Sequence, residues 1–223
     1  MKLRFIMLLY IVVVIAQLYS CWPPMRIRLR YATKMMLMPL LALWFLFGTN
    51  PTPKLMFVGM LCGFAGDLLL LAANKKSFFF VIGSTLFGIG HIFYSVYFQL
   101  QICGSVSPVP IIILSAVYAA YLFFYLRVLY PKLRKVLFFS IGLYLGVICF
   151  MSVSALMYGL WNGGGWNLLP FFGSLVFVFS DGYLIFDKYV KKMPYRHVVV
   201  MFTYILAQTS IAVGVFLKVT GRV

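Results

Sequence analysis

Eight long apolar runs dominate this chain of 223 residues. A helix needs about 20 largely apolar residues to cross the hydrocarbon core of a bilayer, and it satisfies its own backbone hydrogen bonds there. Turn-forming or basic segments separate the runs, as expected of connections between membrane helices. The sequence therefore predicts an all-α fold, a polytopic membrane bundle of eight transmembrane helices. The expected spans are residues 3–20, 35–47, 53–73, 78–102, 108–130, 136–158, 168–186 and 197–217, of which the second is the shortest and has an alternative start near Ile27 as an interfacial helix.

The composition places the chain among integral membrane proteins. Hydrophobic residues make up 64% of the chain and charged residues 10%, whereas soluble domains contain about 45–50% apolar and about 25% charged residues. No polar stretch is long enough to form a soluble domain. We therefore expect a single integral membrane domain over residues 1–223, in which residues 1–30 form a first helix and a basic loop.

The formal net charge of +16 comes from short basic clusters between the apolar runs. No soluble basic face exists to hold nucleic acid, so we expect no nucleic-acid partner. The loops after the first, third, fifth and seventh spans hold 14 of the 19 Lys and Arg residues. The positive-inside rule then predicts that these loops are cytoplasmic and that both termini lie outside, in the plasma (inner) membrane. The 14 residues are Arg26, Arg28, Arg30, Lys34, Lys75, Lys76, Arg127, Lys132, Arg134, Lys135, Lys188, Lys191, Lys192 and Arg196.

The first span has two interpretations. Lys2 and Arg4 precede an apolar core that ends before Cys21, a pattern that also occurs in signal peptides, including those that end in a lipidated cysteine. Tyr19 is bulky for a cleavage site, and the arginine-rich segment that follows would resist translocation. We therefore expect an uncleaved transmembrane helix.

The chain has three acidic residues and no Glu, and two of the three lie inside apolar runs. Asp67 is in the third span and Asp181 in the seventh, while Asp187 lies beside Lys188 where an apolar run ends and needs no special account. A carboxylate in hydrocarbon costs roughly 2.5–3.5 kcal/mol, so such residues are rare unless they are functional. Because both helices run in the same direction, we expect the two aspartates at a similar depth. The structural alternative is that each one only bonds a polar partner between helices.

Each intramembrane acid leads, through a basic loop, into a return helix that carries a polar pair. The pair is His91 with Tyr94 after the first acid, and Tyr204 with Gln208 after the second. The members of each pair share one helix face. This similarity predicts two weakly related halves of four helices each. Gln208 can orient a water or a polar head group, and His91 is either a hydrogen-bonded core residue or part of the site.

The other polar residues predict no metal and no cofactor. A hydrolytic zinc site usually needs three protein ligands, and the chain has only two histidines, His91 and His197, at different depths. His197 is expected at the membrane boundary. The four cysteines are scattered without metal-ligand spacing, and the sequence has no nucleophile elbow or phosphate-binding loop. Lys34 opens the second span, where it either meets a phosphate or extends to the interface, which is the commoner behaviour of such lysines.

Four segments of the chain resemble, in the same order, the YhhN-type lysoplasmalogenase family. They are GDLLLL at 66–71, FGIGHIFY at 87–94, FSDGYL at 179–184 and TYILAQ at 203–208. Lys34 also fits the family pattern, although the residues that follow it depart from the usual Lys-Pro opening. The resemblance makes residues 31–217 a family-like core, in which residues 101–142 match only in hydrophobicity.

The resemblance implies hydrolysis of the vinyl ether bond of lysoplasmalogen, which gives a fatty aldehyde and glycerophosphoethanolamine or glycerophosphocholine. It implies that Asp67 and Asp181 are the catalytic pair. This reaction needs an acid that protonates carbon and a carboxylate that accepts a proton from water, so two carboxyl groups in one apolar cavity suit it. The sequence does not assign the two roles. The resemblance also implies the substrate-binding residues Lys34, His91, Tyr94, Tyr204 and Gln208.

Two other functions fit the same residues. In a proton-coupled membrane transporter, intramembrane acids shuttle protons and repeated halves move about a central site. A non-catalytic lipid-binding membrane protein would keep the fold without the reaction. For the enzyme, the expected partners are a lysophospholipid or ether lipid and the lipid bilayer, and the oligomeric state stays open.

Overall fold

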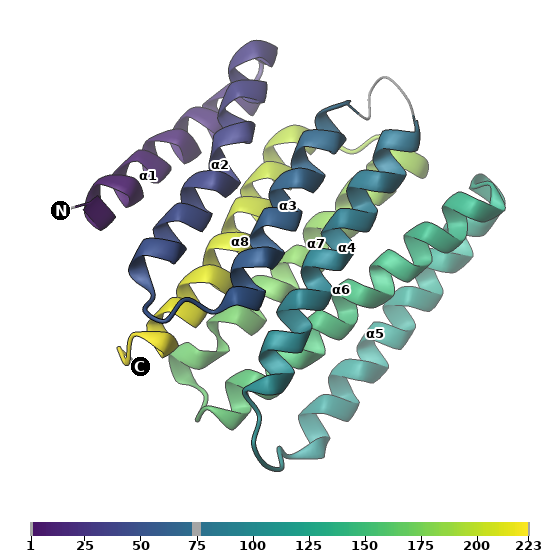
Figure 1. Cartoon of the computed structure of the whole chain (residues 1–223). Helices are drawn as coiled ribbons and strands as arrows, with labels where there is room; N and C mark the ends of the chain where they lie inside the picture. Colours follow the sequence, from purple (N-terminus) through teal and green to yellow (C-terminus); the bar gives the residue numbers. More distant parts are fainter. Residues whose placement is uncertain (1, 73–76, 223) are drawn as a thin grey trace.

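The computed structural model describes residues 2–72 and 77–222. These residues form eight long α-helices and two short 3₁₀ segments, with no strand in the described part (Figure 1). All eight helices are long and apolar enough to cross a membrane, which confirms the predicted fold class. The elements are α1 (Lys2–Cys21), α2 (Ile27–Gly48), α3 (Lys54–Ala72), α4 (Ser77–Leu100), α5 (Pro108–Leu129), η1 (Tyr130–Lys132), α6 (Lys135–Trp161), η2 (Gly165–Leu168), α7 (Leu169–Tyr189) and α8 (Arg196–Val219).

Most helix bounds fall within a few residues of the predicted spans, and α2 differs most. It begins at Ile27 rather than at residue 35, as in the alternative start. The added first two turns contain Arg and Leu, which favour helices, but their arginines kept them out of the predicted apolar span. The extension matters because it places Arg30 and Lys34 on the same continuous helix.

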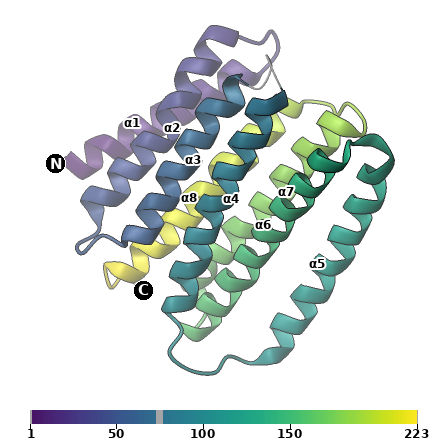
Figure 2. The same ribbon diagram turned by 45° about the vertical axis from the view of Figure 1, so that its right-hand side comes forward.

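Six of the helices form a closed ring. Going around it, α2 packs on α3, α3 on α4, α4 on α6, α6 on α7, α7 on α8, and α8 back on α2. The remaining two helices lie outside the ring, with α1 against α2 and α8, and α5 against α6 (Figures 1 and 2). Each half of the chain thus contributes one outer helix followed by three ring helices, which is the arrangement that two related four-helix halves would give.

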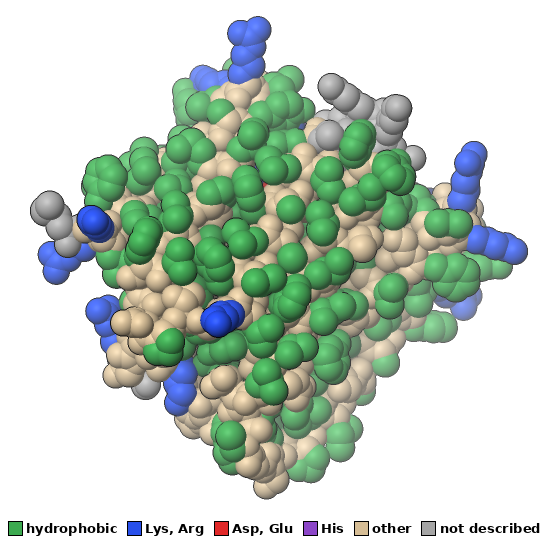
Figure 3. All heavy atoms as spheres, in the orientation of Figure 1, with side chains coloured by type: hydrophobic (Ala, Val, Ile, Leu, Met, Phe, Trp, Pro, Cys, Tyr) green, Lys and Arg blue, Asp and Glu red, His purple; other side chains and the backbone are tan. Residues whose placement is uncertain are grey.

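The outer surface of the bundle is apolar. Large side chains such as Phe5, Ile112, Phe123 and Leu143 are more than 60% exposed. In Figure 3, hydrophobic side chains cover the visible face, and Lys and Arg lie mostly near its edges. Such a surface suits contact with lipid. Hydrophobicity therefore does not distinguish the inside from the outside, and the buried polar groups do.

The connections α1–α2, α5–α6 and α7–α8 lie at one end of the bundle, and both termini lie at the other (Figures 1 and 2). The basic clusters predicted to be cytoplasmic are at the first of these ends, which we call the basic end. Lys75 and Lys76, which belong to the same prediction, lie outside the described residues. The orientation of the bundle in the membrane stays a prediction.

Helix α1 is bound to the rest of the bundle by polar contacts. The hydroxyls of Tyr10 in α1 and Thr209 in α8 are 2.6 Å apart. The buried side-chain oxygen of Gln17 accepts a hydrogen bond from the Thr33 hydroxyl of α2. These contacts join α1 to α2 and α8, and the uncleaved first span stays a prediction.

Candidate active site

Asp67 and Asp181 line the same cavity inside the ring. Its volume is about 50 Å³, and because one water needs roughly 10–15 Å³ by this measure, the cavity has room for a few. All six ring helices contribute to its wall, whereas the outer helices α1 and α5 contribute none of the described lining residues. Each ring helix contributes at least one lining residue, for example Lys34 of α2, Asp67 of α3, Phe87 of α4, Tyr144 of α6, Asp181 of α7 and Tyr204 of α8.

Asp67 is a buried carboxylate with a cation and a phenol as partners. The ammonium nitrogen of Lys34 lies 3.0 Å from its Oδ1. The hydroxyl of Tyr204 donates to its Oδ2 at 2.6 Å. Buried charges in proteins are normally paired and hydrogen-bonded in this way. Asp67 therefore has the surroundings of a stable anion, held by groups from α2 and α8.

Asp181 is also buried but has a different set of partners. The hydroxyl of Tyr144 in α6 donates to its Oδ2. Within residues 2–72 and 77–222, no Lys, Arg or His lies within ion-pair distance of Asp181. The two acids of the cavity thus differ in charge compensation, although each receives one tyrosine hydroxyl.

Small residues beside both acids let the neighbouring helices come close. A Cβ atom on Gly66 would lie 2.6 Å from the Phe87 ring and 3.1 Å from the backbone oxygen of Gly83, so a larger residue would push α4 away from α3. A Cβ atom on Gly182 would lie 2.7 Å from the Tyr125 hydroxyl of α5. Each acid thus has a glycine neighbour in sequence that keeps its helix close to the next one, as is common in membrane bundles.

Comparison with known families decides where this arrangement belongs. The model of the YhhN family matches residues 29–215. The chain belongs to the YhhN family. The match includes all six helices of the ring and both intramembrane aspartates, and it confirms the resemblance seen in the sequence motifs.

Three relatives of this YhhN protein have names that state an activity. It is 29% identical over 169 residues to "Lysoplasmalogenase TMEM86A" of Bos taurus, which covers 74% of this chain and 67% of the relative. It is 27% identical over 168 residues to the Homo sapiens protein of the same name, covering 74% and 66%. It is also 27% identical over 149 residues to "Lysoplasmalogenase TMEM86B" of Mus musculus, covering 67% and 58%. The chain thus spans about two thirds or less of the length of these relatives, and no solved structure matches it.

His91, Tyr94 and Gln208 form a second buried polar group in the YhhN core. The Tyr94 hydroxyl donates to the side-chain oxygen of Gln208 at 3.2 Å. The His91 ring packs against Phe177 with centroids 4.4 Å apart, and neither of its nitrogens has a hydrogen-bond partner among the described residues. None of the three lines the cavity of the acids. The structure therefore brings four of the seven predicted residues together and places the other three beside them, and their roles stay predictions.

Tyr144 is the residue of the cavity that sequence reasoning missed. A buried tyrosine needs a partner for its hydroxyl, so a tyrosine inside an apolar span carries a weak signal. The chain, however, has 15 tyrosines, several of them in predicted spans. Only the fold distinguishes Tyr144, by placing α6 against α7 so that its hydroxyl reaches Asp181.

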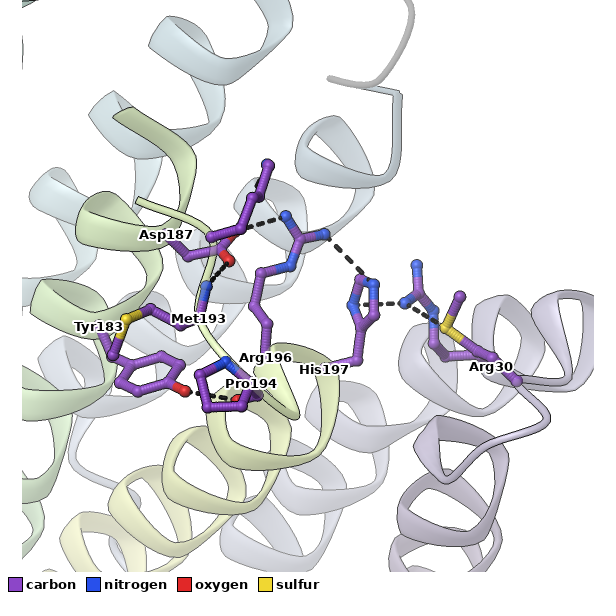
Figure 4. Close-up of polar contacts among 9 residues, drawn as sticks. Arg30, Tyr183, Asp187, Met193, Pro194, Arg196 and His197 are labelled. Atoms are coloured by element: carbon purple, nitrogen blue, oxygen red, sulfur yellow. Dashed lines mark hydrogen bonds and ion pairs between the residues drawn. The ribbon is translucent and has the colours of Figure 1, made fainter. Parts of the chain in front are cut away.

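Asp187 also differs from its sequence interpretation, because it is buried rather than incidental. Its carboxylate accepts hydrogen bonds from the Met193 backbone N–H and from Arg196 Nη1, both at 2.8 Å. Figure 4 shows how these contacts fold the α7–α8 connection back onto the end of α7. Asp187 therefore organises the basic end of the bundle, six positions after Asp181 along α7.

The donor groups near the cavity do not make up a metal site. Within the described ranges, no three His, Cys, Asp or Glu side chains come together. The four cysteines are free and belong to different helices or connections. We therefore assign no residue of this chain to a metal.

Proposed function

We propose that this YhhN protein is a lysoplasmalogenase, a hydrolase that cleaves the vinyl ether bond of lysoplasmalogen without a metal. The observation that carries the proposal is the pair of buried aspartates, Asp67 and Asp181, which line one cavity with unequal charge compensation. The names of the relatives support the same activity. The products would be a fatty aldehyde and a glycerophospho-base.

The reaction needs two proton transfers that the cavity can divide between its acids. A proton added to the β-carbon of the vinyl ether gives an oxocarbenium ion, and water attacks this ion at the carbon bound to oxygen. The water loses one proton, and the resulting hemiacetal breaks into the aldehyde and the free glycerol hydroxyl. One group must therefore donate a proton to carbon while another accepts a proton from water.

The surroundings of the two acids suggest which one has which role. Lys34 compensates the charge of Asp67, so Asp67 is suited to remain a carboxylate that stabilises the cation and accepts the proton of water. Asp181 has no such cation within ion-pair distance among the described residues, and a buried carboxyl group without a counter-ion is best accommodated in its neutral form. We therefore assign Asp181 as the proton donor, with the Tyr144 hydroxyl on its Oδ2 and its Oδ1 free to carry the proton.

The apolar part of the cavity wall fits the beginning of a hydrocarbon chain. Leu70, Phe177 and Ile185 lie around the acids, and most of the wall consists of such side chains. An alkenyl chain that enters here would exclude bulk water from the vinyl ether, so that only the few waters in the cavity could attack. This restriction suits an enzyme that must control where the oxocarbenium ion is captured.

Aldehyde release tests the proposal. Purified protein in detergent should release fatty aldehyde from lysoplasmalogen, and Asp67→Asn and Asp181→Asn should each lower turnover by about 10²–10⁴-fold. Size-exclusion profiles and thermal unfolding would verify that both variants are folded. Full turnover in either folded variant would contradict the proposed roles.

A proton-coupled transporter is the second candidate, because two related halves around intramembrane acids also suit alternating access. The two functions differ in what they require. An enzyme releases aldehyde in detergent, whereas a transporter acts only across sealed vesicles. Proton-linked uptake by vesicles, together with no aldehyde release in detergent, would favour the transporter.

We also infer that the bundle lies in the plasma membrane with its basic end in the cytoplasm and both termini outside, as the positive-inside rule predicts. Cys103 offers a direct probe, since it is exposed in the α4–α5 connection at the end opposite the basic clusters, whereas Cys21 and Cys149 are buried. A membrane-impermeant maleimide should label Cys103 in intact cells. Labelling only after the membrane is opened would reverse the orientation.

A further inference from the structure

A second cavity adjoins the first at the basic end of the bundle. Its volume is about 310 Å³, which lies at the lower end of the range of about 300–1,000 Å³ for ligand sites. Lys34, Leu70, Phe80, Val200 and Met201 belong to the walls of both cavities, so the two share a boundary. We call this second cavity the vestibule. Its cationic wall consists of Arg30, Lys34, Lys188, Lys192 and Arg196.

The vestibule has more positive charge than the protein can neutralise. Asp187 compensates Arg196, at 2.8 Å, and lies 3.8 Å from Lys192. Lys188 lies over the Phe80 ring, 3.6 Å from its centroid, and has no carboxylate. The whole sequence contains only three acidic residues, so no other acidic side chain is available for Arg30.

The contacts of His197 leave a guanidinium donor without an acceptor. Its Nδ1 lies 2.6 Å from Arg30 Nη1 and its Nε2 lies 3.3 Å from Arg196 Nη2 (Figure 4). A guanidinium group only donates, and a neutral imidazole has one acceptor nitrogen. One of the two arginines therefore faces a ring N–H. An anionic oxygen near His197 would accept from that arginine and would balance the charge of Arg30, whereas Asp187 already compensates Arg196.

We propose that the vestibule binds the phosphate diester of the lysophospholipid head group, with Arg30 and Arg196 as its main donors. Two guanidinium groups match the oxygens of a phosphate better than lysines do, because each presents a planar fork of N–H groups. Lys34 lies at the boundary of the two cavities, where the glycerol unit would pass from the phosphate to the acids. This proposal rests on the proposed function, and it adds the substrate group that this part of the chain recognises.

The arrangement fixes the direction in which the substrate lies. In lysoplasmalogen, the phosphate and the vinyl ether oxygen are attached to opposite ends of the glycerol unit. A phosphate in the vestibule therefore directs the vinyl ether toward Asp67 and Asp181, in the cavity beyond Lys34. An ether lipid without a phosphate would lose this anchor.

Binding of non-hydrolysable lipids tests the proposal without requiring turnover. The probes are a saturated 1-alkyl lysophospholipid and the matching 1-alkylglycerol, which lacks the phosphate, each measured by equilibrium competition against a fluorescent lysolipid on the full-length protein. In Arg30→Gln, we expect the affinity for the phospholipid to fall about tenfold or more, because a charge-assisted hydrogen bond is lost. The affinity for the alkylglycerol should change less than threefold.

Two further variants complete the design. Arg134→Gln makes the same charge change at the same end of the bundle, on an exposed residue outside the vestibule, and should leave the ratio of the two affinities unaltered. Lys192→Gln is a second test if Arg30→Gln does not fold, because the Lys192 side chain is 80% exposed. It should shift the ratio in the same direction by a smaller factor.

An unchanged affinity ratio in folded Arg30→Gln and Lys192→Gln would overturn the proposal. Inorganic phosphate provides the other arm of the test, and it should displace the phospholipid but not the alkylglycerol. If inorganic phosphate binds through Arg30 while both lipids bind equally well in wild type, the vestibule is a site for a free anion and the head-group assignment is overturned. Head-group-dependent binding without any aldehyde release would contradict the proposed function alone and leave the vestibule assignment standing.

Discussion

Asp67 and Asp181 occupy corresponding places in the two halves of the bundle, on α3 and α7, yet their surroundings differ. Each receives a tyrosine hydroxyl from another ring helix, Asp181 from α6 and Asp67 from α8. Among the described residues, only Asp67 also has a cation within ion-pair distance, because α2 presents Lys34 where the corresponding helix of the second half, α6, presents Tyr144. The comparison teaches how two similar halves can build a site with two unlike acids.

The largest expected difference between the two acids is the effect of an Asp→Asn substitution on stability. Asp67→Asn leaves the Lys34 ammonium without its partner in a site where its side chain is 17% exposed, so we expect a loss of about 2–3 kcal/mol in the free energy of unfolding. Asp181→Asn removes no ion pair among the described residues and keeps an acceptor for Tyr144, so its loss should be below about 1 kcal/mol. Thermal unfolding in detergent measures both losses. Equal losses would contradict the claim that the two acids differ in charge compensation.

Replacement of Lys34 tests whether the cation creates the difference between the acids. Lys34→Met keeps a side chain of similar length but removes the cation that pairs with Asp67, so that both acids have a tyrosine hydroxyl and no ion-pair partner among the described residues. We expect turnover to fall about 100-fold, because the cavity then lacks a stabilised carboxylate. The measurement is aldehyde release at saturating substrate. Wild-type turnover in Lys34→Met would show that the ion pair has no part in the reaction.

Tyr144 and Tyr204 test the feature that the two acids share, a hydrogen bond from a tyrosine hydroxyl. Tyr144→Phe and Tyr204→Phe each remove one hydrogen bond to a carboxyl group that we propose to be catalytic, so each should lower turnover by about tenfold. The matched control is Tyr118→Phe, whose hydroxyl is also buried but donates to Ser152 at 2.6 Å, away from the cavity. A loss in Tyr118→Phe as large as in the other two would mean that lost hydroxyls act through folding alone.

His91 should give the smallest effect. His91→Phe removes no hydrogen bond among the described residues and keeps a ring of similar size against Phe177. We expect turnover within about threefold of wild type and stability equal or higher, because the cost of a buried unpartnered group is removed. Aldehyde release and thermal unfolding measure these quantities. A 100-fold loss of turnover in a folded variant would place His91 in the site, as the family resemblance implies.

The sequence predicted the parts of this protein that depend on length, polarity and charge. The apolar runs predicted the eight helices, and the two acids inside them marked the cavity wall. The family resemblance implied a place for Tyr204 in the site, and the structure has its hydroxyl on Asp67. The acids were conspicuous in the sequence because an intramembrane charge is costly wherever the helices pack.

The rest depended on contacts between helices that no local pattern specifies. The approach of α6 to α7 selects Tyr144 from many tyrosines, and the packing of the ring leaves His91 out of the cavity wall. Asp187 looked incidental because its partners, Met193 and Arg196, follow after a turn whose path the sequence does not fix. The sequence therefore predicted which residues are unusual but not which of them meet.

The most direct test of the central claim, that the two unlike acids act as one site, is a double-mutant cycle on aldehyde release. Asp67→Asn, Asp181→Asn and the double variant would be compared with wild type at saturating lysoplasmalogen. Residues that act as a unit are non-additive, so each single variant should lose at least about 10²-fold and the double variant little more than the worse single. Losses that multiply in the double variant, or full turnover in either single variant, would contradict the account.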